Sequence, residues 1–94
     1  MKENALSREI IGAAIEVHRE LGPGLLESAY EECLAYEFSL RNLPFERQKE
    51  LPVFYKGKQV ECGFRADFMV DGLVVVELKA VDILGSVDIF SVGR

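Results

Sequence analysis

Three side chains that could take part in a chemical reaction lie in the last third of the chain, namely Asp67, Glu77 and Lys79. Glu77 and Lys79 are two residues apart, so on a β-strand both side chains point to the same face. Two neighbouring carboxylates bind a hard divalent cation such as Mg²⁺ through oxygen. A lysine beside them can position a water molecule or stabilise a developing anion. We therefore predict a carboxylate–carboxylate–lysine centre of the metal-dependent hydrolytic type, active or degenerate.

The turn at Asp71-Gly72 decides whether Asp67 joins Glu77 on one face of a hairpin. A two-residue loop would place the two acids on opposite faces of the sheet. A three-residue loop of residues 70–72, or an equivalent bulge, places them on the same face, and Gly72 suits its left-handed position. We expect the three-residue loop, because the same register that brings the two acids to one face also collects apolar residues on the other.

That loop also predicts a register, in which Asp67 lies opposite Val75 and Arg65 lies opposite Glu77. Two alternatives without a metal stay open: a solvated hairpin with ordinary surface charges, and a structural pair between Arg65 and Glu77. The same register collects apolar residues on the opposite face: Phe64, Ala66, Phe68, Val74, Val76 and Leu78.

The preceding segments predict two helices. Ser7 is a typical N-cap, apolar residues then recur at helical spacing to Leu21, and Gly22-Pro23 ends the helix. A second apolar stripe predicts a helix over residues 25–41. The pattern then changes to strands, which we expect at 45–49, 51–55, 59–70 and 73–81. Pro52 indicates a sheet edge or a strand start.

Length and composition indicate one domain over residues 1–94, with 82–94 a short or poorly ordered tail. Hydrophobic residues make up 49% of the chain, yet none of their runs reaches the roughly 18 residues that span a bilayer. We expect a cytoplasmic protein with no membrane association. The net charge of −5 argues against nucleic-acid binding through a broadly basic surface. Cys33 and Cys62 lack metal-ligand spacing, and we expect both to be reduced.

Several motifs together resemble the GxxExxY protein family, which is grouped with the PD-(D/E)xK nuclease-like superfamily. The signature itself matches Gly24-Leu25-Leu26-Glu27-Ser28-Ala29-Tyr30. Further similarity lies in residues 18–23, in Tyr55-Lys56-Gly57, in Arg65-Ala66-Asp67 and in Val76-Glu77-Leu78-Lys79-Ala80. The resemblance covers residues 4 to about 81. It implies an α+β fold with two N-terminal helices packed on a three-stranded, mainly antiparallel sheet, a truncated form of the superfamily core.

The resemblance also implies site residues. Asp67 and Glu77 resemble the metal-binding acids, Lys79 resembles the catalytic lysine, and Glu27 resembles the helix-borne acid that completes a Mg²⁺ or Mn²⁺ site. His18, Tyr30 and Arg65 are candidate accessory residues. From the residues alone, Glu27 is equally explained as a partner of the helix dipole, and Tyr30 as a packed side chain with a hydrogen-bonded hydroxyl.

The C-terminal part departs from the family pattern. Family members usually continue after the Glu-x-Lys strand with an amphipathic helix and a further strand, and residues 82–94 are too few for both. We expect a truncated, frameshifted or trimmed form in which the 73–81 strand lacks a neighbour. An exposed apolar strand edge favours pairing with a second copy, so a homodimer is expected.

Two functions from different classes follow. The first is a Mg²⁺-dependent nuclease-like hydrolase whose partner is nucleic acid. The second is a non-catalytic interaction module that retains the nuclease-like fold, with activity lost through the short C-terminus. A metal-binding regulatory protein is a weaker third interpretation.

Overall fold

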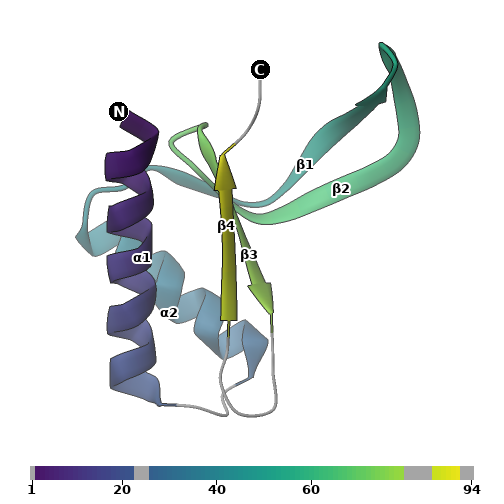
Figure 1. Cartoon of the computed structure of the whole chain (residues 1–94). Coiled ribbons are helices and arrows are strands. Elements are labelled where there is room, and N and C mark those ends of the chain that lie inside the picture. Colours follow the sequence, from purple (N-terminus) through teal and green to yellow (C-terminus); the bar gives the residue numbers. More distant parts are fainter. Residues whose placement is uncertain (1, 23–25, 80–85, 92–94) are drawn as a thin grey trace.

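The computed structural model describes residues 2–22, 26–79 and 86–91. The strands form one antiparallel sheet in the order β1-β2-β3-β4, with both helices beside it (Figure 1). The α+β class is therefore confirmed. The elements follow one another as α1 (Lys2–Leu21), α2 (Glu27–Leu40), β1 (Phe45–Tyr55), β2 (Lys58–Val70), β3 (Val74–Lys79) and β4 (Ser86–Ser91).

Helix α1 begins earlier than its sequence indicates. It already includes Lys2, so the predicted N-cap at Ser7 is wrong. The buried side chain of Leu6 explains the extension, because burying this apolar group favours a helical turn before Ser7. The C-terminal end agrees with expectation. Gly22 adopts a φ of +79° and donates its N–H to the carbonyl of His18 over 2.8 Å.

The core lies between the two helices and one face of the sheet. Three aromatic rings form its centre, because Phe38 of α2 lies 5.2 Å from Phe68 and 5.6 Å from Phe45, measured between ring centroids. Aromatic rings at such distances attract one another beyond the effect of burial alone. The buried sheet residues around them are Phe68, Val70, Val74, Val76 and Leu78. These five alternate along β3 and along β2 from Phe68 onward, as one face of a hairpin requires.

The other face of the sheet carries a smaller apolar cluster of Ala66, Met69 and Val75, with Leu51 and Phe64 packed against it. Phe64 and Ala66 therefore do not join the main core, contrary to prediction. Neither helix in the described part of the chain combines the length and apolar content needed to cross a bilayer.

The sheet has four strands, so the predicted three-stranded sheet is wrong in this respect. Strand β4 pairs antiparallel with β3 from Val74↔Ser91 to Lys79↔Ser86. The physical reason lies in β3, whose Val74, Val75 and Val76 are all buried. A strand buried on both faces needs hydrogen-bonding neighbours on both edges. Because β4 covers that edge, the predicted exposed edge of β3, and the homodimer argued from it, lose their basis.

Strands β1 and β2 run on beyond the rest of the sheet as a long antiparallel ribbon (Figure 1). The two short strands expected over residues 45–55 are one strand, with a register shift between Leu51 and Val53. Pro52 lies at this irregularity in an edge strand, where its missing N–H is tolerated. Lys56 and Gly57 join the ribbon with φ values of +52° and +82°, which suit a tight two-residue turn.

Candidate metal centre on the sheet

The turn between β2 and β3 sets the register of the candidate site. Val70 pairs with Val74, so three residues separate the ladder ends. Asp71 and Gly72 both adopt left-handed φ values, +54° and +65°, and the N–H of Leu73 donates to the carbonyl of Val70 over 3.0 Å. The predicted three-residue connection is confirmed in length, but it comprises residues 71–73. Asp tolerates the left-handed region well, so the turn begins one residue later than predicted.

This register brings Asp67 close to the part of β3 that contains Glu77. The described ladder runs from Val70↔Val74 to Phe68↔Val76, and one further step would set Asp67 opposite Glu77. Glu77 alternates with the buried core residues Val76 and Leu78, whereas the Asp67 carboxylate reaches the backbone of β3 at Leu78. That both acids share one face stays a prediction. The predicted partner of Asp67, Val75, is wrong because Val75 pairs with Met69.

Arg65 does not occupy the predicted position opposite Glu77. The two-residue difference in register moves Arg65 along β2, away from the level of Glu77. Its guanidinium instead lies 3.4 Å from the carboxylate of Glu50 on β1. The side chains of Arg65 and Glu50 are 59% and 77% exposed, so this is a solvent-screened surface pair. A structural Arg65–Glu77 pair is therefore not formed.

The carboxylate of Asp67 marks the end of the β2–β3 ladder. Its Oδ2 accepts a hydrogen bond of 2.7 Å from the backbone N–H of Leu78. With continued pairing, Leu78 would lie opposite Ala66 and its N–H would meet a backbone carbonyl. Asp67 supplies that acceptor from its side chain, and its orientation is fixed beside Glu77. Glu77 is half-buried, and its Oε2 atom is shielded from solvent.

Gln48 of β1 is a site residue that the sequence analysis missed. Its neighbours Arg47 and Lys49 pair with Phe68 and Ala66, which places Gln48 across from Asp67. Its side-chain nitrogen Nε2 lies 3.4 Å from Oδ1 of Asp67. Gln48 has a φ of +52°, a conformation that costs a non-glycine residue about 1–2 kcal/mol. Nothing in the residue types around position 48 indicates this irregularity within an extended strand.

Helix α2 is connected to the site through Glu31. The Nε2 atom of Gln48 lies 3.3 Å from Oε1 of Glu31, and Arg47 donates two hydrogen bonds of 3.0 and 3.1 Å to Oε2. Glu27, the acid indicated by the family resemblance, is exposed at the first position of α2. In the hydrogen bonds of the described residues, Glu31 rather than Glu27 connects the helix to β1. Glu31 follows Glu27 by one helical turn, and this spacing was the signal in the sequence that could have identified Glu31.

Arg47 forms ion pairs with two acids of α2 beside this connection. Its guanidinium also lies 2.6 Å from Oε2 of Glu32. The hydrogen bond from Arg47 lowers the pKa of the Glu32 carboxyl, and the charge of Arg47 adds to this effect. The same contacts raise the pKa of Arg47. Arg47 therefore holds two adjacent acids of α2 against strand β1.

The accessory candidates on the helices lie elsewhere in the fold. The hydroxyl of Tyr30 donates to the carbonyl of Ala14 over 3.1 Å and so joins α2 to α1. Burial raises the pKa of the Tyr30 phenol. His18 lies beside it, with 6.3 Å between the ring centroids. These contacts account for Tyr30 as a packed residue with a satisfied hydroxyl.

The donor set at Asp67 and Glu77 fits a hard divalent cation. Both ligands offer carboxylate oxygen, and Mg²⁺ is commonly held by one or two carboxylates with water completing its shell. Each carboxylate has about four lone-pair positions, so the hydrogen bonds to Asp67 leave it capacity for a cation. Among the side chains that the structure describes, His, Cys, Asp and Glu form no cluster of three or more suited to a metal. Lys79 lies in β3, and its side chain is outside the described set.

Comparison with known proteins identifies a family relationship. The model of a protein family described as the PD-(D/E)XK nuclease superfamily matches residues 4–92. No significant match to a curated protein or to a solved structure was found. The match includes α1 from Asn4 onward, the whole of α2 and all four described strands. The narrower grouping with GxxExxY proteins stays a prediction.

Proposed function

The chain belongs to the PD-(D/E)XK nuclease superfamily, and from this premise we propose that it is a Mg²⁺- or Mn²⁺-dependent phosphodiesterase acting on nucleic acid. The observation that carries the proposal is the hydrogen bond from the N–H of Leu78, the residue after Glu77, to the carboxylate of Asp67, which brings Asp67 to the Glu77 segment where the β2–β3 ladder ends. Family membership supports a nuclease-like domain in general. The metal, the reaction and the residue roles are our inference from the site.

Asp67 and Glu77 are the proposed metal ligands. Oδ2 of Asp67 is oriented by the N–H of Leu78, and Oδ1 lies near the amide of Gln48. A carboxylate held by neighbouring donors loses less conformational freedom when it binds a cation. When bound there, the metal would stabilise charge on phosphoryl oxygens and lower the pKa of a coordinated water.

Lys79 is the proposed catalytic lysine. It follows Glu77 by two residues in β3, and the period of a strand predicts that residues so spaced share a side of the sheet. Its ammonium group would hold the attacking water or donate to the anion that develops on the phosphate. Glu31 is proposed as a positioning residue, because its contact with Gln48 links α2 to Asp67.

Metal titration tests the proposal directly. Mg²⁺ and Mn²⁺ would be added separately to labelled protein while backbone amide signals are followed by NMR. We expect a localised response at Asp67, Glu77 and Leu78 at millimolar metal, and its loss in Glu77→Gln. Glu16→Gln, on the surface of α1, is the matched control and should respond as the native chain does. The absence of any localised response would overturn the metal site.

Cleavage assays then separate binding from catalysis. Single- and double-stranded DNA and RNA would be incubated with metal, with Lys79→Ala as the variant. We expect cleavage by the native chain and a loss of at least about 100-fold in Lys79→Ala, the scale seen when one donor to a developing anion is removed.

One observation favours a non-catalytic module as the second candidate. Both oxygens of Asp67 already accept hydrogen bonds from protein groups, as they would in a purely structural role. That interpretation predicts metal-independent folding, no localised metal response and no cleavage of any nucleic acid.

A further inference from the structure

The far part of the ribbon formed by β1 and β2 projects from the molecule (Figure 1). We call residues 52–63 the arm. The ladder between β2 and β3 covers Phe68 to Val70 of β2. In the described part of the chain, no strand besides β1 and β2 pairs with the arm (Figure 1). A two-stranded ribbon on its own is only marginally stable in water, so a surface of this kind gains from a bound partner.

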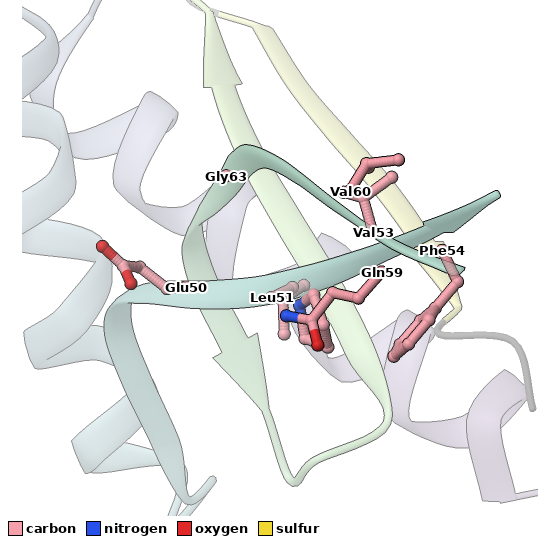
Figure 2. Close-up of a pocket in the computed structure, with 8 residues that line it drawn as sticks. Glu50, Leu51, Val53, Phe54, Gln59, Val60 and Gly63 are labelled. Carbon is pink, nitrogen blue, oxygen red and sulfur yellow. The ribbon is translucent and has the colours of Figure 1, made fainter. Parts of the chain in front are cut away.

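The register of the arm places two kinds of side chain on its two faces. Val53 pairs with Val60 and Phe54 pairs with Gln59, and Figure 2 shows these pairs on opposite sides of the ribbon. The residues drawn in Figure 2 line a hollow of about 480 Å³ along this ribbon. By the same alternation, Tyr55 shares the face of Val53 with its cross-strand partner.

Tyr55 lies among positive charges at the end of the arm. Its cross-strand partner is Lys58, and the Nζ atom of Lys56 lies 5.4 Å from the centre of its ring. The Tyr55 side chain remains exposed, with 65% of its surface accessible. An aromatic ring that stays open to solvent, with an ammonium group near it and a second lysine across the ribbon, is well suited to a ligand that is both flat and anionic.

The charge of the tip contrasts with the rest of the chain. The whole sequence has a net charge of −5, whereas residues 54–59 contain two lysines and no acidic residue. The tip therefore attracts a polyanion in a chain whose net charge is negative. An open aromatic ring with lysines is the arrangement by which proteins hold single-stranded nucleic acid, since an unpaired base can stack on the ring.

We propose that the tip of the arm binds single-stranded nucleic acid, with a base stacked on Tyr55 and the adjoining phosphates at Lys56 and Lys58. This inference rests on the proposed function for the identity of its ligand. It adds the place on the protein where the nucleic acid is held. Gln48, beside Asp67, and Tyr55 lie seven residues apart in β1. That separation corresponds to about 23 Å along the β-strand. One bound nucleic acid can therefore reach from the tip to the candidate metal centre.

Binding would be measured with the full chain and a fluorescein-labelled oligothymidylate of about 16 nucleotides, in EDTA so that cleavage cannot occur. We expect Tyr55→Ala to weaken binding about 5- to 150-fold, the range for loss of one stacked base. Tyr55→Phe keeps the ring and should bind as the native chain does. Replacing Lys56 and Lys58 by Gln should reduce the slope of log affinity against log salt by about 1.4.

Tyr36 provides a matched control, because it is 67% exposed on α2 and lies outside the arm. Tyr36→Ala should leave binding unchanged. The chain contains no tryptophan, so Tyr55→Trp and Tyr36→Trp each introduce a single fluorescent reporter. Oligothymidylate should quench the emission of Trp at position 55 and leave that at position 36 unaffected.

The outcomes separate this inference from the proposed function. Equal binding by the native chain and Tyr55→Ala would overturn the arm site, even if metal-dependent cleavage persists. Tyr55-dependent binding without any metal response would support the arm and remove the phosphodiesterase. Absence of binding by the native chain, or self-association that requires Tyr55 in light scattering, would overturn the arm as a nucleic-acid site.

Discussion

The backbone N–H of Leu78 donates a 2.7 Å hydrogen bond to Oδ2 of Asp67. This bond replaces a ladder hydrogen bond at the position where β2 and β3 cease to pair. The same carboxylate is thus a structural acceptor and a proposed metal ligand. The two roles make different demands, because hydrogen bonding requires an acceptor and metal binding favours a negative charge.

Substitutions at Asp67 should separate these roles. Asp67→Ala leaves the Leu78 N–H without its acceptor and should reduce the free energy of unfolding by about 1–3 kcal/mol. Asp67→Asn keeps a side-chain carbonyl and should cost less, while both variants lose metal binding. Urea unfolding and NMR metal titration measure the two effects. Equal destabilisation by Ala and Asn would show that the acceptor role is unimportant.

At position 48, the usual order of stability between alanine and glycine variants should be reversed. At an ordinary strand position, glycine is the less stable of the two residues. With a φ of +52°, Gln48→Gly should be more stable than Gln48→Ala by about 1 kcal/mol, because glycine adopts this region without strain. Thermal and urea unfolding of the two variants provide the comparison. A more stable alanine variant would contradict the strained backbone.

Phe38 should be the most sensitive core position of α2. It is fully buried and contacts the rings of Phe45 and Phe68. Phe38→Ala should lower the free energy of unfolding by about 3–5 kcal/mol, a large share of the stability of a domain this small. Phe54→Ser, at an exposed position in the arm, should change it by less than about 0.5 kcal/mol. Circular dichroism during urea unfolding measures both.

Tyr30 should make the fold sensitive to alkaline pH. Burial raises the pKa of its phenol above 10.0, so the neutral form is favoured in the folded state. The contribution of the buried, neutral Tyr30 phenol to stability is fully present below pH 10.0. It is lost as pH rises through the folded-state pKa. Absorbance titration of tyrosinate should contain a step above pH 10.0 that is missing in Tyr30→Phe. If Tyr30→Phe leaves the titration above this pH unchanged, the buried phenol is not responsible.

The Arg47–Glu32 contact should make the stability of the fold depend on pH in the acidic range. Arg47 lowers the pKa of Glu32 below its usual 4.5, chiefly through the hydrogen bond between them. Any stability from this pair is present above pH 4.5 and is lost as pH falls through the lowered value. NMR titration of the Glu32 carboxyl should show an upward pKa shift in Arg47→Gln. An unchanged value would mean that the contact does not persist in solution.

Residue patterns along the chain were sufficient for most local structure. Helical periodicity and the Gly22 cap predicted two helices, and alternation predicted the central hairpin. The position of Gly72 and the apolar alternation of the hairpin, together with the two acids, predicted a turn of three residues. These features depend on neighbours in sequence, which act through short-range sterics and hydrogen bonds.

The tertiary structure decided what depends on long-range pairing. The two-residue shift in register, the fourth strand, and the links from Asp67 to Gln48 and Glu31 come from elements distant in sequence. The backbone of β3 requires a partner on each edge, but that requirement does not identify Ser86–Ser91 as the partner. The sequence alone determined which residue types could form the site, and packing determined which of them meet.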